Sequence, residues 1–78
     1  MTKEQSIEKC LERFDELVSE GPHSRIHILS RRRYAPLVRE RSRIAKILRA
    51  EGYSYPVIGE VMIRDHTSIM HLIRKGLE

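Results

Sequence analysis

The stretch of sequence that decides the fold is SYPVIGEVMIRDHTSIMHLI, residues 54–73. It opens on Ser54, a residue type preferred at helix N-caps, and Pro56 suits the first turn of a helix that we expect to end near Val61. Gly59 falls inside this helix, where the missing side chain lets a second helix cross closely. These signals predict a short helix that packs tightly against its neighbour.

A second helix is predicted directly after the first. Asp65 is the next residue suited to an N-cap, and Gly76 marks the expected end of the helix. The residues that we expect to face inward are Ile69, Met70, Leu72 and Ile73. A connection of about three residues, 62–64, between two short helices is typical of a helix-turn-helix. An ordinary corner between two helices of a small bundle is the alternative.

The chain begins with a segment that has one apolar stripe. Over residues 3–19 the apolar positions recur at helical spacing, and Gly21-Pro22 ends the pattern. The stripe consists of Ile7, Cys10, Leu11, Phe14, Leu17 and Val18. We expect it to close the core, because a helix-turn-helix of about 50 residues is marginal alone. A seam with a second copy or with a partner protein is the alternative.

The middle of the chain holds a basic loop between two helices. Residues 23–29 favour a short helix, and residues 30–36 have the composition of a basic loop. A longer helix is predicted from Pro36 to about Glu51, with Gly52 as its stop. Its expected buried positions are Val38, Ile44, Ala45, Ile47 and Leu48. No stretch alternates apolar and polar residues as β-strands do, so the predicted fold class is all-α.

Positive charge is concentrated in one part of the chain. The 78 residues carry 15 Lys and Arg against 11 Asp and Glu, and the sequence pI is about 9.6. Residues 1–20 have a net charge of −3 and residues 21–50 a net charge of +8, mostly from arginine. Arginine suits bidentate contacts to phosphate and guanine. The distribution therefore favours a polyanionic partner over a merely solvated surface.

Length and composition exclude several classes of protein. A chain of 78 residues holds one small domain, too short for a Rossmann fold or a TIM barrel. No apolar run approaches the roughly 18 residues of a membrane-spanning helix, and the first residues lack the apolar segment of a secretory signal. The single cysteine, Cys10, has no partner for an internal disulfide. We therefore expect a cytoplasmic protein that does not bind membranes.

Catalytic and metal-binding chemistry are disfavoured as well. His23 and His27 have the spacing of a metal-binding pair, but no cysteine or carboxylate close in sequence completes the site. Asp65 and His66 lack a nucleophile at usable spacing, and the phosphate-binding motif G-x-x-x-x-G-K-[ST] is absent. We interpret His71 as a helix-packing residue or a phosphate contact. No enzyme activity, metal or cofactor is expected.

Several segments of the last two-thirds of the chain resemble a known family. Residues 63–71, IRDHTSIMH, resemble the RDHTT-V-LH signature of the C-terminal DNA-binding domain (domain IV) of the bacterial replication initiator DnaA. Residues 54–59, SYPVIG, resemble that family's S-L-P-E-I-G. Residues 29–33 resemble the end of its long helix and its basic loop, and residues 41–48 resemble the helix that follows. The resemblance covers roughly residues 25–75.

The resemblance implies a Trp-repressor-like all-α fold and binding to a short asymmetric duplex site, the DnaA box, similar to TTATCCACA. By the resemblance, the N-terminus of a recognition helix would lie in the major groove with Arg64, Asp65, His66, Thr67 and Ser68. A basic loop with Arg31, Arg32 and Arg33 would place Arg33, or a neighbour in this triplet, in the adjacent minor groove. Contacts to the DNA backbone or flanking bases would come from Tyr55, Pro56, Arg41 and Arg43.

The chemistry of these side chains suits base recognition without reference to the family. The Asp65 carboxylate can accept a hydrogen bond from the N4 amino group of cytosine, and the Thr67 methyl can contact a thymine methyl. His66 can donate to N7 or O6 of a purine. A recognition helix presents its N-terminal residues to base edges, and arginine gains from the negative potential of a narrow A·T-rich minor groove.

The chain also departs from the family pattern. Met62-Ile63 stands where Gly-Gly is common, the turn is about one residue shorter, and Ser68 replaces the second threonine. The initiator's ATPase module is absent, and the acidic first segment matches none of its other domains. We therefore expect residues 1–22 to form an acidic amphipathic helix and residues 23–78 a stand-alone DNA-binding domain of the type found in phages and mobile elements.

The predicted function is that of a sequence-specific regulator that binds double-stranded DNA and acts in transcription or DNA replication. Because a DnaA-like box is asymmetric, we expect a monomer, with a homodimer through the N-terminal helix as the alternative. The alternative function is a protein-interaction module that docks on the replication or transcription machinery through the acidic helix of residues 1–22.

Overall fold

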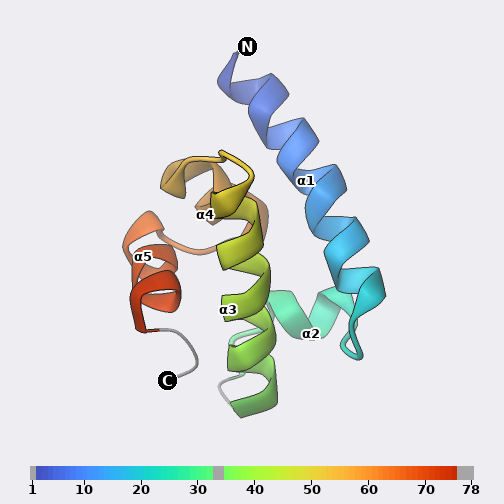
Figure 1. Ribbon diagram of the computed structural model, residues 1–78. Helices are drawn as coiled ribbons and strands as arrows, with labels where there is room; N and C mark the ends of the chain where they lie inside the picture. Colours follow the sequence, from blue (N-terminus) through green and yellow to red (C-terminus); the bar gives the residue numbers. More distant parts are fainter. Residues whose placement is uncertain (1, 33–34, 76–78) are drawn as a thin grey trace.

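The computed structural model describes residues 2–32 and 35–75, which fold into five α-helices without a β-strand (Figure 1). The helices are α1 (Lys3–Glu20), α2 (Arg25–Leu29), α3 (Ala35–Ala50), α4 (Tyr55–Met62) and α5 (His66–Lys75). The predicted all-α class is confirmed, and each expected helix is present with its ends within two residues of the expectation. The long helix α3 runs through the middle, with α1 on one side and α5 on the other.

Polar side chains set the starts of three helices. Thr2 and Gln5 form a capping box at α1, in which each side chain accepts a hydrogen bond from the other residue's backbone N–H, at 3.2 and 3.0 Å. Ser24 caps α2 and Ser54 caps α4, each accepting from the N–H three residues later at 3.4 Å. The start of α4 predicted from Ser54 is therefore confirmed.

All five helices contribute to one hydrophobic core. Its buried apolar residues are Cys10, Phe14, Leu17, Val18, Ile28, Leu37, Ile44, Ala45, Leu48, Val57, Ile58, Val61, Met62 and Ile69. The stripe of α1 packs on α4 and α3 inside this core, with Ile7 and Leu11 partly buried at its edge. This packing confirms the expectation that the first helix closes the core.

The core differs from the expectation in a few positions of α3 and α5. Val38 and Ile47 are half-buried, whereas Leu37 is fully buried, because the core-facing stripe of α3 is centred on Leu37, Ile44 and Leu48. Of the four residues of α5 expected to face inward, only Ile69 is fully buried. The other three are half-buried, so α5 lies at the margin of the core.

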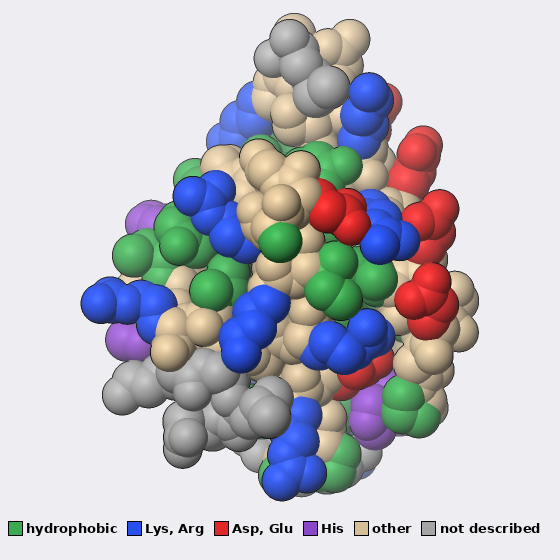
Figure 2. All heavy atoms as spheres, viewed as in Figure 1, with side chains coloured by type: hydrophobic (Ala, Val, Ile, Leu, Met, Phe, Trp, Pro, Cys, Tyr) green, Lys and Arg blue, Asp and Glu red, His purple; other side chains and the backbone are tan. Residues whose placement is uncertain are grey.

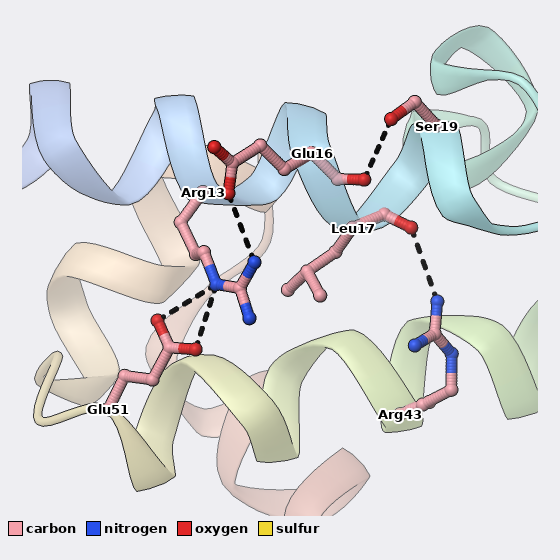
Figure 3. A network of polar contacts seen from close by, with 6 residues as sticks. All are labelled: Arg13, Glu16, Leu17, Ser19, Arg43 and Glu51. Carbon is pink, nitrogen blue, oxygen red and sulfur yellow. Dashed lines mark hydrogen bonds and ion pairs between the residues drawn. The ribbon is translucent and has the colours of Figure 1, made fainter.

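Two arginines tie α1 and the α3 region together from opposite directions (Figure 3). Arg13 of α1 donates to the carboxylate of Glu51, just after α3, with Nε 2.8 Å from Oε2. Arg43 of α3 donates to the Leu17 carbonyl of α1 at 3.2 Å and to Glu40 Oε1 at 2.8 Å. The hydrogen bonds from Arg43 hold the pKa of the Glu40 carboxyl below its ordinary value of 4.5.

The connection between α4 and α5 is short and tightly packed. It spans residues 63–65, and Ile63 has a left-handed backbone with φ 53°. The Arg64 N–H donates to the Gly59 carbonyl at 2.8 Å, and a Cβ at Gly59 would lie 2.6 Å from the Arg64 carbonyl oxygen. The missing side chain at Gly59 thus accommodates the backbone of the turn as it leads into the second helix.

Candidate nucleic-acid interface

Four of the predicted DNA-contacting residues lie on the surface at the N-terminal end of α5. Asp65, His66, Thr67 and Ser68 are all exposed, and one Asp65 carboxylate oxygen lies 3.4 Å from Nδ1 of His66. The first backbone hydrogen bond of the helix runs from the Ile69 N–H to the Asp65 carbonyl, at 3.1 Å. Asp65 therefore occupies the N-cap position. Its side chain is 70% exposed, so the carboxylate faces solvent.

Arg64 joins the basic loop to this end of α5. Its Nη2 donates to the Ser30 carbonyl at 2.6 Å, and its Nη1 lies 3.5 Å from the Leu29 carbonyl. The structure therefore places the guanidinium of Arg64, a predicted base contact, against the loop backbone. Arg31 and Arg32 follow Ser30 and are exposed. The bond thus brings two exposed arginines close to the start of α5.

Arg41, another predicted DNA contact, lies inside the protein rather than on its surface. This residue is only 4% exposed, and its guanidinium lies under the loop. It donates to the carbonyl of Ile28 at 2.8 Å, of Arg32 at 2.6 Å and of Ser30 at 2.7 Å. The carbonyls at the end of a helix lack intrahelical partners, and a guanidinium with five N–H donors satisfies several of them together. Arg41 therefore holds the loop from inside.

The remaining predicted contacts differ in position. Arg43 donates to Glu40 of its own helix and to the Leu17 carbonyl of α1, so the structure places its guanidinium beside α1. The half-buried ring of Tyr55 packs under the guanidinium of Arg49, 4.5 Å from Cζ to the ring centroid. Pro56 is exposed. Arg33 lies outside the described residues.

Two residues extend the exposed polar stripe of α5 beyond the predicted set. His71 and Arg74 follow Thr67 at i+4 and i+7, the spacing of one helix face, and both are exposed. This spacing is the sequence signal that identifies them. The exposure of His71 rules out the interpretation that it packs inside the protein. The stripe therefore continues along α5 for two further turns.

An open hollow of about 470 Å³ lies beside the turn between α4 and α5. It is lined by Pro56, Gly59, Glu60, Ile63, Arg64, Asp65 and His66. The polar lining combines two carboxylates with a guanidinium and an imidazole, without a hydroxyl or thiol that would act as a nucleophile. The Cys10 thiol lies in the core instead, where burial raises its pKa to about 12.

Charged side chains are unevenly distributed on the face shown in Figure 2. On this face acidic side chains gather over α1, and lysine and arginine side chains are spread over α3 and toward α5. Within residues 2–32 and 35–75, no three His, Cys, Asp or Glu side chains are placed to hold a metal ion. Over the same residues, each helix is either too short or too polar to cross a bilayer.

Comparisons with protein-family models, with curated proteins and with solved structures found no match to this chain. The features that bear on function are the exposed N-terminal end of α5, the exposed Arg31 and Arg32 beside it, and the motif in residues 63–71.

Proposed function

We propose that the protein binds double-stranded DNA with sequence preference, and that α4 and α5 act as a helix-turn-helix. The observation that carries the proposal is the hydrogen bond from Arg64 to Ser30, at 2.6 Å. This bond brings two exposed regions together on the surface. They are the first turn of α5 and the pair Arg31 and Arg32. One duplex can therefore meet both.

Each part of this surface has a distinct task in the proposed complex. The first turn of α5 enters the major groove, where Asp65, His66 and Thr67 have the donor, acceptor and methyl groups that read base edges. Arg31 and Arg32 contact phosphates or the adjacent minor groove, which positions the protein without reading sequence directly. The N–H groups at the start of α5 favour a phosphate nearby.

The resemblance to the DNA-binding domain of DnaA supports the same assignment. Residues 54–59 correspond to α4 with its cap, and residues 63–71 to the turn and the first half of α5. By this resemblance the target is a short asymmetric box, and the protein is a regulator of transcription or replication.

Selection of binding sites from random duplexes tests the proposal. We expect one recovered motif without an inverted repeat, because a single domain occupies an asymmetric site. A pool that is bound but shares no sequence would contradict sequence preference, and a protein that retains no duplex would contradict DNA binding.

Variants of the first turn of α5 test the roles of individual residues. Asp65→Asn, His66→Ala and Thr67→Ala should each lose about 1–3 kcal/mol of binding free energy on the selected duplex and much less on a random duplex. Lys9→Ala, which removes an exposed charge on α1, is the control and should retain the preference. Equal losses on both duplexes would contradict base reading by these side chains.

A further inference from the structure

Ile63 is an unusual residue for its position in the turn. The residue is 68% exposed, and its backbone is left-handed, with φ 53° and ψ 50°. β-branched residues seldom adopt this conformation, because Cβ crowds the following carbonyl oxygen, whereas glycine adopts it readily. Neither the backbone geometry nor burial in the core therefore accounts for an isoleucine here.

The surroundings of Ile63 are the groups proposed to face DNA. Ile63 lines the hollow beside the turn together with Pro56, Asp65 and His66. Asp65 and His66 are polar, so Ile63 and Pro56 provide the apolar part of the lining. In the major groove the base pairs expose one apolar group, the C5-methyl of thymine.

We infer that Ile63 is a specificity-determining residue that contacts the C5-methyl group of a thymine in the bound duplex. This inference rests on the proposed DNA-binding function. Contact with the methyl group removes apolar surface of both partners from water and favours thymine over cytosine without a hydrogen bond. Backbone strain retained at an exposed residue is a feature of binding sites, which fits this role.

The chain offers a matched control in Ile26. It is the other large hydrophobic residue that is strongly exposed among the described residues, at 80%. It lies on α2 and does not line the hollow. Replacing either isoleucine removes the same side chain, but only Ile63 belongs to the proposed interface.

A double-mutant cycle between protein and DNA tests the contact. The selected duplex is compared with duplexes in which one thymine at a time is replaced by deoxyuridine, which removes only the methyl group. At one position the wild type should lose about fourfold in affinity, the equivalent of one buried methylene. Ile63→Gly and Ile63→Ala should lose about fourfold on the thymine duplex and nothing further on the deoxyuridine duplex.

Two controls accompany the cycle. Ile26→Ala should behave as the wild type on every duplex, and melting curves verify that the Ile63 variants are folded. The contact would be overturned if the affinity losses from the Ile63 substitution and from methyl removal were additive at every thymine. It would also be overturned if the Ile63 variants bound with wild-type affinity. Either result would leave the proposed function intact. Failure to recover any preferred duplex would overturn the proposed function and the contact together.

Discussion

Arg41 and Arg64 both donate to the carbonyl oxygen of Ser30, from Nη2 atoms at 2.7 and 2.6 Å. A carbonyl oxygen has two lone pairs, so it accepts both bonds together. Arg41 reaches it from α3, below the loop, and Arg64 from the turn before α5. The loop that carries the exposed arginines is therefore fixed from two sides.

Arg41→Ala should strongly destabilise the protein. The substitution removes the guanidinium that donates to the Ile28 and Arg32 carbonyls, and hydrogen bonds to a charged group contribute about 1.5–3 kcal/mol each. We expect the free energy of unfolding, measured by urea denaturation, to fall by about 3 kcal/mol or more. Arg39→Ala removes an exposed arginine from the same helix and should change it by less than about 0.5 kcal/mol. Equal stability of the two variants would refute the structural role of Arg41.

Arg64→Ala and Arg31→Ala should weaken DNA binding in different ways. If Arg31 contacts a phosphate, its removal should flatten the plot of log K against log salt by about 0.9. Arg64 bonds to the loop backbone, so its removal should lower affinity with little change of that slope. Titrations at several salt concentrations measure both quantities. A slope change of similar size in the Arg64 variant would place its guanidinium on a phosphate.

Ile63→Gly should stabilise the folded protein, although most glycine substitutions destabilise. The left-handed backbone costs a residue with a side chain about 1–2 kcal/mol, and the greater freedom of glycine in the unfolded chain offsets about half of the gain. We expect a net increase of about 0.5–1 kcal/mol in the free energy of unfolding, seen as a higher midpoint in urea. In contrast, Ile26→Gly in α2 should lower the midpoint. A lower midpoint for Ile63→Gly would show that the turn is not strained.

Glu40 should contribute to a loss of stability in acid. Its pKa in the folded protein lies below the ordinary value of 4.5, chiefly because of the hydrogen bonds from Arg43. A lowered pKa means that the carboxylate stabilises the fold at pH values above its ordinary pKa. This contribution is lost as the pH falls through the folded-state pKa. Glu40→Gln should therefore be less stable than the wild type at neutral pH, and the difference should shrink below about pH 4.5. Thermal melts across this range measure it, and a constant difference would contradict the ion pair.

The protein should be a monomer in solution. The apolar stripe of α1 is buried against α4 and α3, so it is not available as a seam with a second copy. Sedimentation equilibrium at tens of micromolar should give a mass near 9.2 kDa. Twice this mass, together with selected sites that contain inverted repeats, would indicate a two-fold repressor instead.

The positions of the helices were largely predictable because their signals are local. Ser54 caps α4 as its residue type indicates, and the 3.6-residue period of α1 identifies the face that enters the core. The role of Gly59 was also predictable in outline, since a glycine at a tight crossing indicates close approach. The sequence does not reveal that the approaching group is the Arg64 carbonyl.

The parts of the candidate site that sequence reasoning missed depend on contacts between distant residues. Arg41 lies within a run of basic residues, where solvent exposure is the reasonable expectation, and its burial depends on carbonyls up to 14 positions earlier in the chain. Arg64 belongs to the motif of residues 63–71, yet it bonds to Ser30, 34 positions away. No local pattern encodes either bond. The exposed residues at the start of α5 were easier to identify, because the helical period alone distinguishes their exposed positions from the buried position of Ile69.

The separation of charge between α1 and the basic part of the chain makes the protein an electric dipole. The first 20 residues carry a net charge of −3 and the next 30 a net charge of +8. If the partner is DNA as proposed, its field should exert a torque as well as an attraction on such a molecule and turn it before contact until α1 points away. This orientation should shorten the search for the productive pose, and added salt should slow association more than it speeds dissociation.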